Sequence, residues 1–213
     1  MQIHDISITT TPETVTWDGG ESGHVTEWLS VIGPDRVATV STQSFGSHTG
    51  THLDAPLHFI AGGGTVEQLD VNAMIGEAWV VVIDGPLVTK QLLEEAGLPG
   101  GLRRIVFKTE NTKRELLQDR EFHKDFVAID PEAAQWLVDR GVVLVGIDYL
   151  SVGPYNETNV VTHRILLGAK VVAVEGLDLR GISPGRYFLV VLPPKFAGVE
   201  GCPCRAVLIE GLS

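Results

Sequence analysis

The sequence has few basic residues, only two cysteines and no long apolar run. Sixteen lysines and arginines stand against 27 acidic residues, and the resulting formal charge of −11 argues against nucleic acid or an anionic membrane as a partner. No apolar stretch reaches the roughly 18 residues of a membrane-spanning helix, and the first residues do not resemble a signal peptide. These absences lead us to expect a cytoplasmic protein.

Two further absences narrow the chemistry. No Gly-x-Ser-x-Gly segment occurs, which disfavours a serine hydrolase built on a nucleophile elbow. The only cysteines, Cys202 and Cys204, are too close in sequence for a relaxed disulfide, and two thiols alone make a poor soft-metal site. We interpret them as small buried residues at the start of a strand.

The remaining composition is that of an ordinary globular protein, with 213 residues of which 44% are hydrophobic and 20% charged. We expect one domain, residues 1–213, with short strands in its first third and strands alternating with helices after residue 64. Expected strands are residues 3–8, 37–40, 78–83, 105–107, 142–147, 171–174, 188–192 and 206–209, and expected helices are 89–96, 130–141 and 162–168. The pattern predicts an α/β fold whose central sheet is buried on both sides.

The segment from His48 to His58 carries the strongest functional signal. It contains three of the seven histidines of the chain, together with Asp54, among small and apolar residues. Neutral imidazole and carboxylate are the ligands that zinc and similar divalent metals prefer. The segment therefore predicts a metal site.

Spacing constrains the shape of this segment. His48, His52, Asp54 and His58 are separated by even numbers of residues, so a straight strand would direct all of them to one face. The same strand would hold His48 and Asp54 about 20 Å apart, far too distant to share a metal. We expect a tight, irregular connection that bends near its glycines and proline and turns three or four side chains inward.

Three polar residues farther along the chain are candidates for a second metal. Asp148 and Glu175 each follow an apolar strand, at the end where α/β sheets usually bind ligands. His163 lies in a predicted helix ahead of the strand that ends at Glu175. A carboxylate at the end of a buried strand needs a cation or a metal, although a salt bridge at Glu175 and an exposed helical histidine at position 163 are the simpler interpretations.

The pattern His48-x-Gly50-Thr51-His52-x-Asp54-x-Pro56-x-His58 resembles the hallmark of the cyclase-type metal-dependent hydrolases, which include bacterial kynurenine formamidase and isatin hydrolase. Similar stretches, less specific by themselves, occur at 146–151, 163–167, 174–177 and 204–208. The resemblance runs from about residue 7 to the end of the chain. It implies a mixed, strongly curved and partly closed β-sheet flanked by helices, of the swivelling β/β/α type.

The resemblance also implies roles for individual residues. By similarity, His48, His52 and Asp54 would hold one divalent ion, and Asp54 would bridge to a second ion that His163 and Glu175 complete. Zinc or manganese are the expected metals. Two such ions can polarise an amide carbonyl and activate water, and His58 matches the general acid/base that serves the leaving amine.

The substrate is expected from the resemblance to be a small aromatic amide, most of all N-formylkynurenine, an intermediate of tryptophan catabolism by the kynurenine pathway. Kynurenine-specific members have a tryptophan early in the sequence that contacts the substrate, and Trp17 is the corresponding residue. Its context departs from the family, because Asp18-Gly19-Gly20 follows where Pro-Gly-Asp is usual. Trp17 could equally pack at a loop edge. Related enzymes are dimers, which implies a homodimer here.

Three alternatives stay open at this point. The same chemistry could act on a cyclic amide such as isatin or on a lactone. His52, Asp54 and His163 formally compose the two-histidine, one-carboxylate triad of Fe(II) oxygenases, but that interpretation leaves His48 and His58 without a role. A non-catalytic metal-binding protein is the third alternative.

Overall fold

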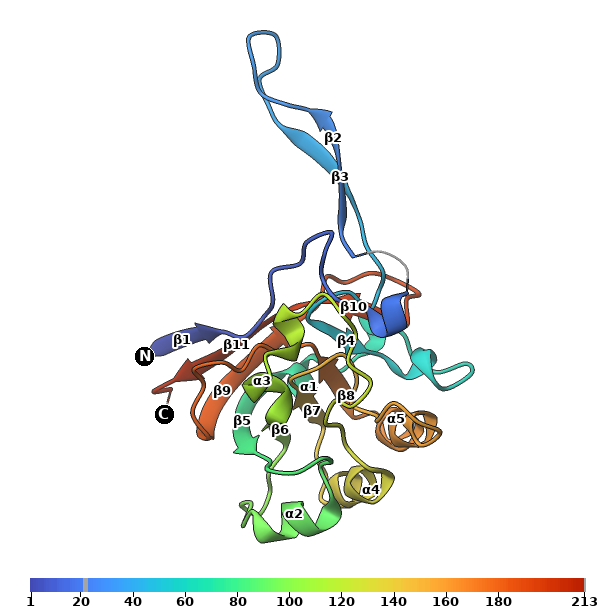
Figure 1. The fold of residues 1–213 in the computed structure, drawn as a ribbon, viewed down its shortest axis with the longest axis vertical. Coiled ribbons are helices and arrows are strands. Elements are labelled where there is room, and N and C mark those ends of the chain that lie inside the picture. Colours follow the sequence, from blue (N-terminus) through green and yellow to red (C-terminus); the bar gives the residue numbers. More distant parts are fainter. Residues whose placement is uncertain (21–22, 213) are drawn as a thin grey trace.

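A nine-stranded mixed sheet forms the body of the protein (Figure 1). The computed structural model describes residues 1–20 and 23–212. The strands of this main sheet are β1 (Gln2–Asp5), β4 (His52–Asp54), β5 (Ile75–Val82), β6 (Arg104–Lys108), β7 (Leu144–Ile147), β8 (Val172–Glu175), β9 (Gly185–Leu192), β10 (Gly201–Pro203) and β11 (Arg205–Glu210). The helices are α1 (Val71–Met74), α2 (Lys90–Glu95), α3 (Glu110–Lys113), α4 (Pro131–Asp139) and α5 (Asn159–Gly168). Among the described residues, no helix is both long enough and apolar enough to cross a membrane.

The order of strands in the main sheet is β1-β11-β9-β5-β6-β7-β8-β4-β10. Strands β5, β6, β7 and β8 are parallel neighbours, and helical segments connect each of them to the next. All other pairs are antiparallel. This arrangement places the three-residue strand β4 between β8 and β10, strands that come from the last fifth of the chain.

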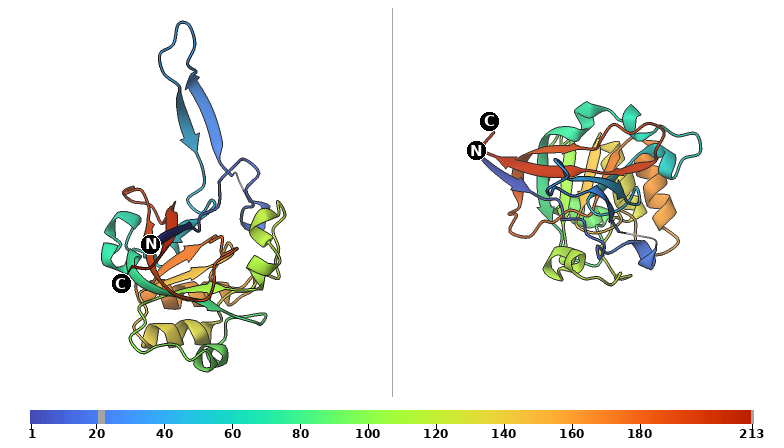
Figure 2. Two further views of the ribbon diagram at one scale, coloured as in Figure 1. Left: turned by 90° about the vertical axis from the view of Figure 1, so that its left-hand side faces the viewer. Right: turned by 90° about the horizontal axis from the view of Figure 1, so that it is seen from above.

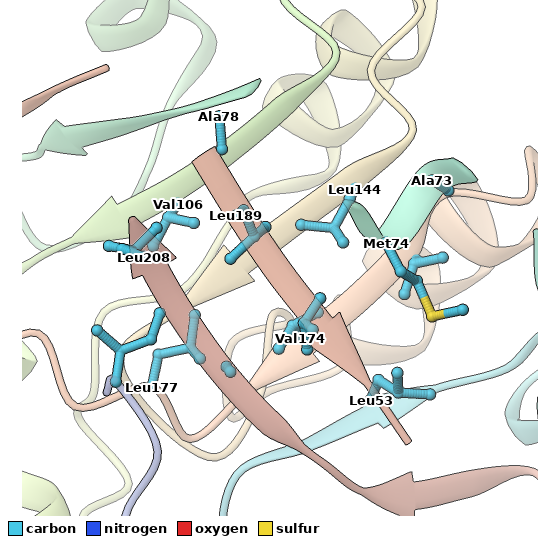
Figure 3. Close-up of a cluster of buried hydrophobic side chains, with 14 of the residues drawn as sticks. Leu53, Ala73, Met74, Ala78, Val106, Leu144, Val174, Leu177, Leu189 and Leu208 are labelled. Carbon is cyan, nitrogen blue, oxygen red and sulfur yellow. The ribbon is translucent and has the colours of Figure 1, made fainter. Parts of the chain in front are cut away.

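The main sheet is strongly curved, and one core fills its concave side. Figure 3 shows Leu189 of β9 and Leu208 of β11 facing Val106, Leu144 and Val174 of the parallel strands. Strands β8 and β11 are far apart in the sheet order, so these contacts require the sheet to curl over its own face. A bridge between residues 7 and 177 further joins the two sides. The expected mixed, curved and partly closed sheet is confirmed.

Helices cover the other face of the parallel strands (Figures 1 and 2). A second core packs α2, α4 and α5 against β6, β7 and β8, with Phe107, Leu137 and Leu166 buried. Helices α2 and α4 begin at the expected N-cap residues. The side chains of Thr89 and Asp130 accept hydrogen bonds from first-turn amides of these helices. The central strands are thus buried on both sides, as their continuous apolar runs predict.

The cysteines also lie where expected. Cys202 is buried in β10, and Cys204 is partly buried immediately before β11. Both are free thiols. They act as small residues in the packing of the concave core.

One element was not expected from the sequence. Strands β2 (Val25–Ser30) and β3 (Val40–Ser44) compose a separate two-stranded hairpin that projects from the body (Figure 1 and the left view of Figure 2). We call residues 25–44 the arm. The expectation of a strand at 37–40 is wrong except at its last residue, because residues 37–39 belong to the loop that joins β2 to β3. The apolar residues of the arm are exposed. A prediction that assumes one buried face for each strand therefore misses β2 and most of the hairpin.

Candidate metal centre

The site is built on β4 and the turns on either side of it. Antiparallel pairing places His52 opposite Glu175 of β8 and Asp54 opposite Gly201 of β10. Since alternate residues of a strand share a face, His52 and Asp54 project to the same side. The preceding bend is at Gly50, whose φ of +70° favours glycine. The segment is therefore bent, as expected, but its middle is a regular strand.

Three imidazoles lie around Asp54, two from its own segment and one from α5, and Glu175 of β8 joins two of them. His48 Nδ1 lies 2.9 Å from Asp54 Oδ1, and His52 Nε2 lies 3.8 Å from the same oxygen. His163 Nε2 lies 3.8 Å from Asp54 Oδ2. Glu175 contacts two of these imidazoles, at 3.1 Å from His52 Nε2 and 3.4 Å from His163 Nε2. The structure thus brings together all five predicted metal ligands.

The cluster fits a divalent metal. Both carboxylate oxygens of Asp54 and the Nε2 atom of His52 are buried and have no hydrogen-bond partner among the described residues. Buried polar atoms without partners are rare because each one costs free energy. His52 Nδ1 and His163 Nδ1 each lie 2.9 Å from a backbone carbonyl, of Gly50 and Asn159, which leaves Nε2 free to bind a metal.

The ion pairs of Glu175 with His52 and His163 change the pKa values of all three side chains. Burial disfavours the charged form of His52 and of His163, but the ion pairs with Glu175 outweigh it and raise the pKa of both imidazoles. Burial likewise opposes ionisation of Glu175, yet the same two histidines lower the pKa of its carboxyl. A metal competes with protons for His52 and His163, so metal affinity should rise with pH.

Possible ligand atoms fall into two groups that share Asp54. One group is His48, Asp54 and His58, and the other is His52, Asp54 and Glu175; within each group the donor atoms lie within 4.8 Å of one another. The His58 ring lies 4.0 Å from the His48 ring, and burial lowers the pKa of His58. His58 is therefore placed to act on a proton beside the cluster or to bind an ion, and its predicted role as acid/base stays a prediction.

A cavity of about 240 Å³ opens onto the cluster. His48, His58, His163 and Glu175 form its polar end. Its other lining residues are Trp17, Phe59, Leu150, Ser151 and Asn159. A concave site that combines aromatic and aliphatic side chains with convergent polar groups is the usual form of a small-molecule site.

Two aromatic side chains shape this cavity. Trp17 both lines it and packs against Phe122 and Tyr155, with ring centroids 4.9 and 5.4 Å apart, so the two interpretations of Trp17 are compatible. Phe59 stacks on the His163 ring at 4.2 Å. The sequence prediction missed Phe59, although its position directly after His58 could have indicated it.

Asp148 has a different task from the metal ligands. Its buried carboxylate accepts hydrogen bonds from the backbone and side chains of Thr109 and Thr112, at 2.6–3.1 Å, and from Asn111 Nδ2 at 3.2 Å. These bonds attach the start of α3 to the end of β7. Its donors satisfy the carboxylate without a cation, which explains why a carboxylate at a strand end need not be a metal ligand.

Similar proteins share this architecture. The Cyclase family model, described as "Putative cyclase", matches residues 4–154. Cyclase-like protein 2 of Arabidopsis thaliana is 36% identical over 219 residues, which cover 98% of this chain and 79% of that protein. This chain belongs to the cyclase family. Kynurenine formamidase of Salinibacter ruber, another similar protein, is 34% identical over 98% of this chain and 97% of its own length.

Solved structures agree with this membership. A potential metal-dependent hydrolase with cyclase activity superposes with a TM-score of 0.84 over 97% of this cyclase-family chain and 96% of its own, at 28% identity. Isatin hydrolase A from Labrenzia aggregata, at 21% identity and a TM-score of 0.77 over 97% and 93% of the two chains, shares the fold. The chain is a metal-dependent hydrolase of the cyclase family, so the oxygenase and the non-catalytic alternatives are set aside.

Proposed function

We propose that this protein hydrolyses the C–N bond of an aromatic formamide, with N-formylkynurenine as substrate and kynurenine and formate as products. One observation carries the proposal: the buried cluster around Asp54 faces a cavity with an apolar aromatic wall. The kynurenine formamidase of Salinibacter ruber, similar over the full length, supports the substrate class. Isatin hydrolases share the fold and support a cyclic amide as the second candidate.

Two divalent ions, zinc or manganese, are proposed as cofactors, and Asp54 would contribute to holding both. His48 and His52 would complete one ion, and His163 and Glu175 the other. When bound, the ions would activate a water molecule and polarise the amide carbonyl.

The chain's own residues then position the substrate and move protons. Trp17 and Phe59 would contact the aromatic ring and direct the formamide toward Asp54. His58 is held largely neutral near pH 7 because burial lowers its pKa, so it can accept a proton from water. It would then return this proton to the departing amine, which is a poor leaving group without one.

The decisive experiment measures turnover of N-formylkynurenine by protein loaded separately with zinc and manganese. We expect release of kynurenine and formate that a chelator abolishes. In the Trp17→Ala variant, KM should rise about 2–10-fold, as expected for loss of an aromatic contact, whereas Trp17→Phe should restore most of the affinity. Turnover of isatin but not of formamides would replace this substrate by the second candidate.

We further propose that the protein is a homodimer whose contact includes the arm. Trp28, Ile32 and Val37 of the arm are 61%, 66% and 98% exposed, and an isolated two-stranded hairpin is marginally stable in water. The solvent-accessible surface of 10620 Å² also exceeds the ~9600 Å² usual for a monomer of this mass. Only Glu27, Asp35 and Arg36 are charged in the arm, so two copies can approach without strong repulsion.

Light scattering coupled to gel filtration tests the dimer. The native mass should be about twice 23.0 kDa, and the double change Trp28→Ser with Ile32→Ser should reduce it to the monomer value. Val71→Ser, at an exposed apolar residue outside the arm, is the matched control and should leave the dimer intact. A native protein of 23.0 kDa at micromolar concentration would refute the dimer.

A further inference from the structure

The histidines of the cluster differ in the group that contacts the ring nitrogen on the far side from the proposed metal. His52 and His163 each have a backbone carbonyl 2.9 Å from Nδ1. Among the described residues, 1–20 and 23–212, no backbone carbonyl accepts a hydrogen bond from the His48 ring. On the side of the ring away from Asp54, Oε1 of the Glu200 carboxylate lies 3.4 Å from His48 Nε2. The two groups are in ion-pair range but lack the alignment of a hydrogen bond.

Glu200 is fixed to the metal-binding strand from two sides. Its backbone carbonyl accepts a hydrogen bond of 2.8 Å from the amide of Ala55, the residue after Asp54. Its carboxylate accepts a hydrogen bond of 2.5 Å from the hydroxyl of Ser47, the residue before His48. Glu200 therefore connects both ends of the segment that supplies His48, His52 and Asp54.

The neighbouring Gly201 provides the space that His48 needs. A Cβ atom at Gly201 would lie 2.6 Å from Cε1 of the His48 ring and 3.0 Å from Nε2. Real Cβ atoms do not approach other atoms so closely, so the imidazole can lie against β10 only because residue 201 is a glycine. Glu200 and Gly201 together define where the ring lies and which way it turns.

We propose that Glu200 is a positioning residue for the metal centre: when an ion is bound beside Asp54, the Glu200 carboxylate accepts the Nε2–H of His48 and thereby keeps Nδ1 directed at that ion. A carboxylate behind a histidine ligand fixes its tautomer and makes its other nitrogen a stronger ligand. Glu200 would also add a third negative charge, after Asp54 and Glu175, beside the proposed ions. The proposal rests on the proposed metal site but does not depend on the substrate.

Metal affinity of the metal-free protein tests this assignment directly. Zinc would be titrated against a chromophoric chelator in Glu200→Ala, Glu200→Gln and native protein. We expect Glu200→Ala to weaken one of the two ions by about 10–100-fold, with a smaller loss in Glu200→Gln, whose amide oxygen can still accept the Nε2–H. Gly201→Ala should weaken the same ion, because the added methyl group displaces the His48 ring while Glu200 is retained.

Glu67→Gln is the matched control. Glu67 accepts a hydrogen bond from the amide of Gly198, in the same loop as Glu200, and its replacement changes the net charge equally. It should change zinc affinity less than about twofold. The thermal midpoint of each metal-free variant shows whether the protein is folded. Native zinc affinity in a folded Glu200→Ala variant would overturn the proposal, whereas binding of zinc without turnover of any formamide would refute only the proposed substrate.

Discussion

Replacement of Asp54 by asparagine should abolish hydrolysis, with kcat/KM falling by more than about 10³-fold, or ~4 kcal/mol of transition-state stabilisation. Asp54 is fully buried and is common to both groups of possible ligands. An amide keeps the shape of the side chain but loses the negative charge and one of the two acceptor oxygens. Both ions should therefore be weakened at once, and bound metal measured by mass spectrometry should fall together with activity.

A stability measurement separates loss of metal from loss of folding. A ligand at 100 times its Kd stabilises a native protein by about 2.7 kcal/mol, so zinc should raise the Tm of the native enzyme by several degrees. This increase should disappear in Asp54→Asn, while the metal-free variant still unfolds cooperatively. Asp35→Asn, on the exposed arm, is the control and should retain the full increase. A metal-dependent increase in Asp54→Asn would contradict the central place given to this carboxylate.

Replacement of His58 by glutamine should reduce turnover of a formanilide by about 10²–10⁴-fold while bound metal stays unchanged. Glutamine fills a similar volume but cannot carry a proton from water to the amine. An aryl formate ester with a nitrophenol leaving group should lose less than the formanilide does, because His58 would still be missed as the acceptor of the proton from water but that leaving group departs without a proton. Assays of both substrates on the same preparation give the comparison.

The same comparison decides whether His58 is an acid/base or a metal ligand. If His58 is instead a ligand, with His48 and Asp54, metal content should fall and both substrates should suffer equally. The pH profile of the native enzyme adds an independent measure. Since burial lowers the pKa of His58 below the usual 6.5, its neutral form extends to lower pH than that of a free imidazole, and the acid/base step should extend with it. As the pH falls, activity should be lost first through protonation of the metal ligands, because protons compete with the metal for His52 and His163. The pKa values of both imidazoles are raised in the metal-free protein.

The sequence predicted the parts of the fold that depend on local chemistry. Strands β5 to β8 follow from continuous apolar runs, and α2 and α4 from Thr89 and Asp130 at their first turns. The arm escaped prediction because its apolar residues do not face a core. Its length and register depend on pairing between β2 and β3 across a nine-residue loop, and no short-range pattern specifies this.

In the candidate site, too, residues specified by local sequence could be predicted and a residue placed by long-range strand pairing could not. His48, His52, Asp54 and His58 could be found because a bent segment of eleven residues concentrates ligand chemistry. Glu200 could not, because nothing in its local sequence distinguishes it from any surface glutamate. Its place beside His48 follows only from the pairing of β10 with β4, two strands separated by about 150 residues.

Placement of β4 between β8 and β10 has a consequence for biosynthesis. The histidine-rich segment leaves the ribosome early, but its two neighbouring strands, which supply Glu175 and the backbone partners of residues 52–54, are made more than a hundred residues later. During that interval the imidazoles are exposed on an unpaired segment and can hold a metal only loosely. Selection of the ion is thus postponed until the polypeptide is almost finished.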